Sequence, residues 1–577
     1  MSALIQALDT YTPKQIGENG HAEYGWSNDI KERIVQFNFQ LTRTNDKGIK
    51  KLQYILNDIL KSLKMKIGSN IIMEREKAKD LLTIMYKMIG YTRDIIDGKG
   101  ECALTYMLIY TWYDYYPELS KFALKCLVDL GDSKSHQYGS WKDIKYFCQY
   151  CKDQMGEIGH PLITYSIQLM NEYLRNDYTS FIKSNEPNIS LVAKWIPREK
   201  SSFSWMYEKL AVDYFKEYIV TANSFTSQQK AILKCKTDYR KIISGLNCHI
   251  DTLQIKQCGR NWSAIDFNKV TSISVTKQKK AFLNIKNNGD ERYPDNEDRA
   301  LCASNFKWHI QSAVQSNTEM KGKRVSMADF TKQALTVKTE TEIDLLNSQW
   351  RDNSTQTGAL GNMIAMVDVS GSMDGDPMHV AIALGIRIAE KSVLGKRVMT
   401  FSSKPSWVNL EPFPDFVSKV KAITYSEWGM NTNFRAALDM ILNAIIQNKM
   451  PPEDVRDMVL VILSDMQIDQ GDHSAEDSMY EMMKKKYEDA GIRVHGKPYK
   501  MPHILFWNLR STSGFPTLSN KENSSMMSGF SPSILNLFCD NGMEALQTCN
   551  PWSILYNSLD NERYKIMSDK LNQEIIL

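Results

Sequence analysis

The sequence has no long apolar segment. None of its apolar runs approaches the ~18 residues that a membrane-spanning helix requires, so we expect no membrane span. The first residues, MSALIQALDTYTPKQ, also lack the basic and apolar regions of a secretory signal peptide. Together these absences predict an intracellular, cytoplasmic protein.

Cysteine is sparse, with ten in 577 residues, and no dense disulfide framework is evident. Scattered cysteines predict reduced thiols, as in a cytoplasmic compartment. Cys148 and Cys151 have the spacing of metal ligands, but no second pair lies at zinc-finger spacing. Because the segment WKDIKYFCQYCKD has a helical pattern, we interpret both as buried thiols.

A large net charge is missing as well. The formal value is +4, which excludes both a polycation and an acidic tail protein. The charge is nevertheless uneven, because the residues before Thr357 carry +9 and the remainder −5. This asymmetry is compatible with a polyanion-binding first part and equally with an ordinary solvated surface.

Common catalytic motifs are also absent. The sequence contains no G-x-x-x-x-G-K-[ST] phosphate loop, no H-E-x-x-H zinc motif and no G-x-S-x-G nucleophile turn. We therefore predict that the protein is not an enzyme.

The first part of the chain has the sequence pattern of helices. Residues 1–28 are polar and predict a loose arm. Residues 29–350 show apolar residues at helical spacing, as in LQYILNDILKSLKMKIG. No fixed sequence period links the segments, but stacked helix pairs of the HEAT-like kind are the expected architecture of this all-α region.

A second sequence pattern begins after a linker predicted at 351–361. In 362–577, short apolar runs such as NMIAMVDV and MVLVILSD alternate with helical patterns. Short continuous apolar runs are typical of buried parallel strands. We therefore predict a multidomain protein in which the helical region precedes a doubly wound, Rossmann-like α/β domain.

Oxygen-bearing side chains follow the predicted strands. Asp368, Ser370 and Ser372 come after the first run, Thr432 precedes a helix, and Asp465 ends MVLVILSD. Because loops at the carboxyl ends of the strands build the site of such a sheet, these groups could converge on one hard cation, Mg²⁺ or Mn²⁺. With two carboxylates among five ligands, that metal would stay electrophilic and capture a carboxylate or phosphate.

A simpler interpretation makes Ser370 and Thr432 helix caps and lets Asp368 merely end a strand. Capping alone does not explain the order D-x-S-x-S together with Asp465 at a second strand end. His379, on the following helix, could approach the site, but a lone histidine on a mixed face is more often structural.

The pattern DVSGSM, NTN and SDM resembles the metal-ion-dependent adhesion site (MIDAS) of von Willebrand factor type A (vWA) domains. This resemblance covers about residues 357–577 and implies that all five groups bind the metal. The wider chain resembles an uncharacterised family, a domain of unknown function found in eukaryotes and large DNA viruses; a viral member would reside in the host cytoplasm. The segments that carry this resemblance are DGKGE, YGSWKDI, VAKWIPREKSSFS, NEDRALCASNF and SDMQID. The layout is remotely similar to the Ro (TROVE) ribonucleoproteins, in which a helical ring binds RNA.

These observations favour a non-enzymatic, metal-dependent binding protein of the ribonucleoprotein type, whose TROVE-like helical region binds RNA. Basic residues near Trp141 and Trp195 would supply phosphate contacts beside stacking aromatics. The candidates are Arg93, Lys99, Lys142, Lys194 and Arg198. The alternative is a protein interaction scaffold whose metal binds an acidic residue of a partner. Metal-assisted phosphoryl transfer is a third, weaker hypothesis. No oligomeric state is predicted.

Overall fold

The structure is a computed structural model. It describes residues 11–17, 22–132, 135–184, 187–316, 318–400, 405–425, 434–467, 476–512, 514–540, 546 and 548–576. The chain forms two compact units. Unit 1 comprises Met1–Leu104, Thr271–Thr276 and His309–Leu577, and unit 2 comprises Thr105–Val270 and Lys277–Trp308.

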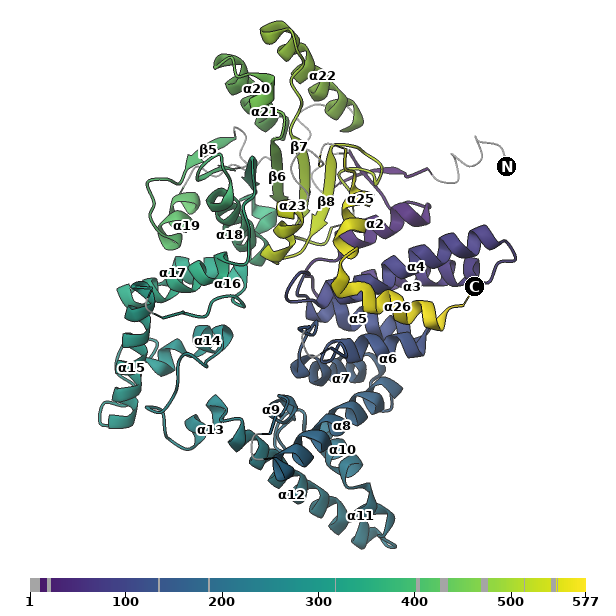
Figure 1. The fold of residues 1–577 in the computed structure, drawn as a ribbon, viewed down its shortest axis with the longest axis vertical. Coiled ribbons are helices and arrows are strands. Elements are labelled where there is room, and N and C mark those ends of the chain that lie inside the picture. Colours follow the sequence, from purple (N-terminus) through teal and green to yellow (C-terminus); the bar gives the residue numbers. More distant parts are fainter. Residues whose placement is uncertain are drawn as a thin grey trace. The chain divides into compact units, whose positions relative to one another are not determined.

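The predicted order of a helical region and an α/β domain is confirmed (Figure 1). Before the sheet, the described elements are helices apart from two short strands, β1 (Lys14–Ile16) and β2 (Ala22–Tyr24). The helices are α2 (Ile30–Gln40), α3 (Asp46–Ile67), α4 (Ile72–Arg93), α5 (Cys102–Tyr113), α6 (Pro117–Cys126), α7 (Trp141–Met155), α8 (Pro161–Lys183), α9 (Val192–Trp195), α10 (Ser204–Tyr214), α11 (Lys216–Val220), α12 (Phe225–His249), α13 (Leu253–Cys258), α14 (Ser272–Phe282), α15 (Glu297–Val314), α16 (Met327–Thr336) and α17 (Glu340–Ser354).

The sheet of unit 1 has six strands in the order β5–β4–β3–β6–β7–β8. Every neighbouring pair is parallel except β4 and β5. From β3 the chain builds β4 and β5 on one side, then returns to build β6, β7 and β8 on the other, so the strand order reverses between β3 and β6. The strands are β3 (Met363–Val367), β4 (Arg397–Thr400), β5 (Ser406–Asn409), β6 (Val459–Ser464), β7 (His503–Asn508) and β8 (Ser524–Ser528).

Both faces of this sheet are covered. Every residue of β3, β6, β7 and β8 is buried, and alternate residues of a strand point to opposite faces. One core contains Ala365, Val367 and Val461 together with residues of several helices. Among those helices are α18 (Asp376–Lys391) and α19 (Phe416–Thr424), as well as α16 and α17, which precede the sheet in the chain. Coverage of both faces agrees with the predicted doubly wound arrangement.

The remaining helical elements lie in the second half of unit 1. They are η1 (Gly371–Met373), α20 (Phe434–Gln447), α21 (Pro452–Val455), α22 (Glu476–His495), η2 (Pro532–Leu535), α23 (Asn536–Asp540), α25 (Pro551–Leu559) and α26 (Glu562–Glu574). In Figure 1 the yellow helix α26 lies beside the purple helix α4, with which it is in contact. A helix near the end of the chain therefore packs against one from its first hundred residues.

The segment expected to be a linker is held by a buried cation. Helix α17 extends to Ser354, and Arg387 of α18 donates to Asn353 Oδ1 (2.9 Å) and Thr357 Oγ1 (3.1 Å). Its guanidinium lies 4.3 Å from the centroid of the Trp350 ring. Burial lowers the pKa of Arg387 to about 10. The start of the expected linker is thus part of the packed structure, because its oxygens accept hydrogen bonds from both terminal nitrogens of this guanidinium.

The N-terminal segment packs against the sheet. Strands β1 and β2 pair antiparallel, and Tyr24 pairs with Phe515, so the described part of the expected loose arm has regular structure. Helix α2 contacts β8, and Asn508 Nδ2 donates to Phe39 O (3.0 Å). The compact units therefore divide the chain differently from the domains expected at 29–350 and 362–577.

Two buried charges connect the first and last segments of unit 1. Asp94 accepts hydrogen bonds from Arg563 Nε (2.7 Å) and Nη2 (2.6 Å) and from the Tyr564 hydroxyl (3.0 Å). Lys99 Nζ donates to Asn38 O (2.8 Å), Leu41 O (3.0 Å) and Ser528 Oγ (2.7 Å). Burial lowers the pKa of Lys99 to about 7. Each charge is satisfied by segments far apart in the sequence.

Unit 2 is helical. Its helix α7 begins with a capping box, in which Ser140 N donates to Asp143 Oδ2 (2.8 Å). It ends at Gly156, whose φ of 71° is a left-handed conformation that glycine adopts without steric cost. Cys148 and Cys151 are buried free thiols on this helix, as expected. These caps fix the length of the helix that carries Lys142.

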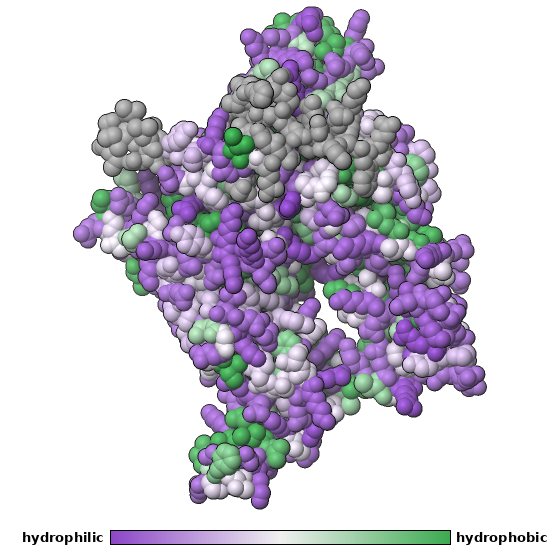
Figure 2. All heavy atoms as spheres, turned by 180° about the vertical axis from the view of Figure 1, so that it is seen from behind, coloured by the Kyte–Doolittle hydropathy of each residue, from purple (hydrophilic) through white to green (hydrophobic). Residues whose placement is uncertain are grey.

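The surface shown in Figure 2 is mostly hydrophilic, with hydrophobic residues in small separate groups. None of the helices in the described ranges is long and apolar enough to cross a membrane. All ten cysteines are free thiols.

Candidate functional site

Asp368 and Asp465 lie at the point where the strand order reverses. Asp368 directly follows β3, and Asp465 directly follows its parallel neighbour β6. The backbone pairing continues past β3, since Asp368 N donates to Leu463 O (3.1 Å). In open α/β sheets, ligands bind outside the carboxyl ends of the strands at this reversal. The fold therefore brings these two predicted ligands to the expected edge of the sheet.

The carboxylate of Asp368 is buried and held in a fixed orientation. Its Oδ1 accepts from Ser370 N (2.9 Å), and its Oδ2 accepts from Ser464 Oγ (2.6 Å). Burial raises the pKa of Asp368 and the charge of Asp465 adds to that rise, although the hydrogen bonds from Ser464 and Ser370 oppose it. Two carboxylates thus lie close together in a region poorly accessible to water.

The predicted hydroxyl ligands follow Asp368 on one short loop. Ser370 precedes the 3₁₀ helix η1, and the hydroxyl oxygens of Ser370 and Ser372 are 3.0 Å apart. The loop then turns at Gly375, whose φ of 94° is left-handed, before α18 begins at Asp376. The alternate positions of the two serines therefore place their oxygens side by side, as the D-x-S-x-S order predicts.

Arg510 is a residue of this site that sequence reasoning missed. Its Nη1 lies 3.4 Å from Asp465 Oδ2 and donates to Ser372 O (3.1 Å). Oδ1 of the same aspartate accepts from Gln467 N (3.1 Å). Arg510 follows β7, the next strand after β6, so a basic residue just beyond a third strand end was the available signal. Its side chain is 43% exposed and supplies a positive charge at the edge of the site.

Two other sequence predictions have different outcomes. Thr432 lies outside the described residues. His379 is half-buried on α18, and its Nδ1 has no hydrogen-bond partner among the described residues. Burial lowers the pKa of His379, and the nearby charge of Lys332 lowers it further. The structure shows no contact between His379 and either buried carboxylate.

The donors in the described part of the site fit a hard divalent cation. Asp368, Asp465, Ser370 and Ser372 offer oxygen atoms only, which Mg²⁺ and Mn²⁺ prefer. Within the described residues, no group of three or more His, Cys, Asp or Glu side chains gathers to hold a metal. A cation at this edge would therefore depend on the serine hydroxyls as well as the two carboxylates.

The five predicted RNA-binding residues fall into two groups. Arg93 and Lys99 are buried in unit 1, and a phosphate would have to displace three protein acceptors to reach the Lys99 ammonium. Lys142 and Arg198 are exposed in unit 2, and Lys194 is half-buried there. The latter three remain compatible with a solvent-borne ligand.

One face of α7 carries lysines against aromatic rings. Lys145 Nζ lies 4.5 Å from the Phe203 ring centroid, and Lys142 and Lys145 each lie 5.4 Å from that of Tyr146. About two turns further along α7, Lys152 Nζ lies 5.1 Å from the centroid of the Trp205 ring. No ion pair of these three lysines is present among the described residues. We call this surface, formed by Lys142, Lys145, Tyr146, Lys152, Phe203 and Trp205, the α7 face.

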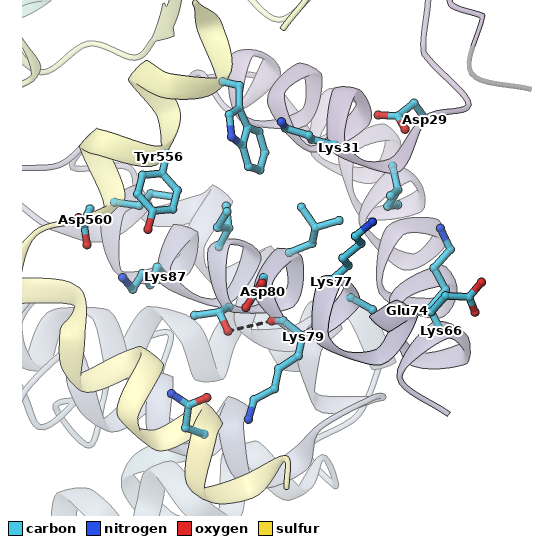
Figure 3. Close-up of a pocket in the computed structure, with 18 residues that line it drawn as sticks. Asp29, Lys31, Lys66, Glu74, Lys77, Lys79, Asp80, Lys87, Tyr556 and Asp560 are labelled. Atoms are coloured by element: carbon cyan, nitrogen blue, oxygen red, sulfur yellow. Dashed lines mark hydrogen bonds between the residues drawn. The ribbon is translucent and has the colours of Figure 1, made fainter. Parts of the chain in front are cut away.

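A cavity of about 840 Å³ in unit 1 has a mixed charge (Figure 3). Lys31 lies 4.3 Å from the Trp552 ring centroid at its wall. Five lysines and four carboxylates line it, and Figure 3 shows the two kinds interspersed. The near balance of charge gives this cavity no evident preference for an anion.

Comparison with known proteins reveals relatives of unknown function. Residues 162–358 match a family described as a domain of unknown function, DUF2828, and residues 362–572 match another, DUF7788. The chain is 28% identical over 515 residues to Uncharacterized protein L728 of Acanthamoeba polyphaga mimivirus. That similarity covers 85% of this chain and 82% of the viral protein. The expected relation to uncharacterised domains and to a viral protein is thereby confirmed.

Proposed function

We propose that the protein is a binding protein whose α/β unit uses a divalent cation to capture an anionic group. The observation that carries this proposal is the position of Asp368 and Asp465, which flank the reversal of strand order beside two adjacent serine hydroxyls. In this proposal the site is of the MIDAS type, with Thr432 as the fifth ligand, and the domain is of the vWA type. The proposed cation is Mg²⁺ or Mn²⁺.

Each residue of the site has a defined part in this proposal. Asp368 and Asp465 supply the negative charge, and Ser464 and the Ser370 amide hold Asp368 in position. When bound, the cation would offer an electrophilic position to a carboxylate or phosphate oxygen. Arg510, beside Asp465, would add a second positive charge for the incoming anion. Binding is favoured over phosphoryl transfer because no general base contacts the two carboxylates among the described residues.

Mn²⁺ binding followed by electron paramagnetic resonance tests the metal site. The wild-type protein should bind one Mn²⁺, and both Asp368→Asn and Ser370→Ala should weaken its binding at least about tenfold, since the first removes a ligand's negative charge and the second a ligand oxygen. Asp489→Asn, which changes an exposed carboxylate of α22, is the matched control and should bind normally. If Asp368→Asn binds Mn²⁺ as tightly as the wild type, the proposal is wrong.

The captured anion can be distinguished with the same ion. Water bound to Mn²⁺ enhances proton relaxation, and a ligand oxygen that replaces this water lowers the enhancement. An acidic peptide that lowers it would favour the protein-scaffold form of the proposal. A single-stranded oligonucleotide that lowers it instead would place RNA at the metal.

RNA binding by unit 2 is the second proposed function, and the α7 face supports it. Single-stranded nucleic acids bind where cations for the phosphates stand beside aromatic rings for the bases. The face provides both along α7, and Lys142 to Lys152 spans about 15 Å at 1.5 Å per residue. Burial lowers the pKa of Lys145, and the nearby Lys142 lowers it further. A phosphate between these two lysines would relieve their mutual repulsion.

Charge removal tests this second function. The triple variant Lys142→Gln, Lys145→Gln, Lys152→Gln should weaken binding of a labelled single-stranded RNA. It should also reduce the slope of log K against log salt by about 2, at about 0.7 per phosphate contact. The control changes three exposed lysines elsewhere in unit 2, at positions Lys230, Lys241 and Lys269, to glutamine. Equal loss in both variants would reveal only general charge attraction and would count against a specific face.

A further inference from the structure

A second cavity, of about 430 Å³, lies within unit 2. It is bordered by α9, by the loop Pro197–Phe203 and by α12 and α13. Pockets that hold small ligands commonly have volumes of about 300–1,000 Å³. The cavity therefore has room for a ligand of about the size of one nucleotide.

The border of this cavity is strongly basic. Lys194, Arg198, Lys200 and Arg240 line it, against the single carboxylate of Glu199. Glu199 pairs with Arg240 at 3.1 Å, which leaves three cations in excess. The cavity of unit 1, with five lysines and four carboxylates, has no comparable excess. The charge of the unit 2 cavity therefore favours an anion.

Lys194 is the most informative of these cations. Burial alone lowers the pKa of Lys194, and no ion pair of this residue is present among the described residues. A half-buried ammonium without a carboxylate nearby is costly to the fold. A bound phosphate would offset that cost, whereas a neutral ligand would not.

The interior suits a heterocyclic ring better than a bare anion. Ile196, Pro197 and Ile243 supply apolar surface, and polar side chains lie beside them. Gln254 also lines the cavity, and its Oε1 is buried with no hydrogen-bond partner in the described structure. An amide of this kind can pair with the edge of a base. Apolar walls with a few polar groups are the usual lining of ligand pockets.

The cavity is continuous with the α7 face through one loop. Arg198 O accepts from Ser201 N (3.1 Å) and Ser201 Oγ (2.8 Å), and Phe203 N donates to Ser201 Oγ (3.2 Å). This turn carries Arg198 at the cavity and Phe203 at the α7 face, where Lys145 approaches the ring. A strand lying on the α7 face could thus place one nucleotide in the cavity.

We propose that this cavity binds one nucleotide, with its phosphate at Lys194 and Arg198 and its base against Ile196, Pro197 and Ile243. The inference rests on the proposed RNA binding by unit 2 and assigns it a pocket. The nucleotide belongs to a single-stranded RNA whose neighbouring residues lie on the α7 face. A free nucleotide has the same chemistry, so the experiment separates the two sources.

Two kinds of variant test the pocket by fluorescence anisotropy with a 12-nucleotide single-stranded RNA. Lys194→Gln with Arg198→Gln should weaken binding about tenfold or more and lower the salt slope by about 1.4 for two phosphate contacts. Lys230→Gln with Lys241→Gln removes equal charge elsewhere in unit 2 and should have little effect. Ser244→Phe fills the cavity from α12 without changing charge, and should weaken binding while the salt slope stays unchanged. Ser244→Ala, which keeps the cavity open, is its control.

The results distinguish this pocket from the proposed RNA binding itself. If RNA binding depends on the α7 lysines but tolerates both Ser244→Phe and the Lys194/Arg198 variant, the pocket is wrong and RNA binding stands. Adenosine and uridine monophosphates provide the second arm. A nucleotide that binds the wild type but not Ser244→Phe, while the RNA does not bind, would support a pocket for a free nucleotide and contradict RNA binding. If neither RNA nor nucleotide binds the wild type, both proposals are overturned.

Discussion

Several charged residues of units 1 and 2 have opposite surroundings. In unit 1, Asp94, Lys99 and Arg387 are buried, and each is surrounded by specific hydrogen-bond partners. In unit 2, Lys142 and Lys194 have no ion pair within the described ranges, and face aromatic rings or a cavity. A buried, satisfied charge is already used by the fold, whereas an unpaired cation near the surface is available to a ligand. The difference indicates that Asp94, Lys99 and Arg387 serve the fold of unit 1, whereas Lys142 and Lys194 of unit 2 are available for binding.

The largest expected effect is the loss of stability when a buried carboxylate of unit 1, Asp94, is removed. Asp94→Ala leaves the Arg563 guanidinium, only 17% exposed, with the more distant carboxylate of Asp97 at 3.6 Å, and loss of one partner of a buried pair costs about 3–5 kcal/mol. We expect unit 1 to lose that much stability in urea unfolding followed by hydrogen exchange of α4 and α26. The control in unit 2 is Glu118→Ala, which breaks an exposed pair with Lys121 and should cost less than about 1 kcal/mol. Equal losses of stability in Asp94→Ala and Glu118→Ala would contradict the contrast between the buried and exposed charges.

The sequence predicted the sheet well because its signal is local. The apolar runs at Met363–Val367 and Val459–Ser464 form buried parallel strands, and the polar groups placed after them meet at one edge of the sheet. The structural roles of Lys99 and Arg387 could not be predicted. Their partners come from other segments, and for Lys99 these are backbone carbonyls and Ser528, which carry no sequence signal. The packing of helix α2 on β8 could not be predicted for the same reason.

A second prediction concerns the pH dependence of unit 1. Burial lowers the pKa of His503 to about 4, below the usual value near 6.5 of the unfolded chain. Between these values the unfolded state binds more protons, so stability rises with pH and is lost as the pH falls from 6.5 to 4. His503→Gln keeps a partner for Ser525 Oγ but cannot titrate. We expect the wild type to lose up to about 1.4 kcal/mol per pH unit more than this variant.

Urea unfolding at pH 7 and pH 4.5, followed by hydrogen exchange of β7 and β8, measures that slope. His136→Gln changes an exposed histidine of unit 2 and should leave the slope as it is. If the wild type and His503→Gln lose stability in parallel, His503 is not buried in its neutral form.

A third prediction sharpens the role of Arg510 and rests on the proposed metal site. Its guanidinium lies 3.4 Å from Asp465 Oδ2 and repels a cation that approaches the same carboxylate. Because its side chain is 43% exposed, solvent screens this repulsion to about 1 kcal/mol. Arg510→Gln should therefore tighten Mn²⁺ binding about fivefold in the paramagnetic resonance titration. Weaker Mn²⁺ binding in this variant would show that Arg510 supports the site instead.

The smallest expected effect is a change in the pKa of Lys145 in unit 2, which tests whether the lysines of this unit are available to a ligand. Lys142 lowers the pKa of Lys145 by charge repulsion, in addition to the larger effect of burial. Lys142→Gln removes that charge, so the pKa of Lys145 should rise towards its ordinary value while burial still holds it below that value. NMR of ¹³C-dimethylated lysines reports this titration for the free protein and for its RNA complex. In the wild type, a phosphate bound between the two lysines should raise the same pKa, because a negative charge favours the ammonium form. A Lys145 pKa that responds to Lys142→Gln but not to RNA would mean that the crowded lysines exist without a ligand on the α7 face.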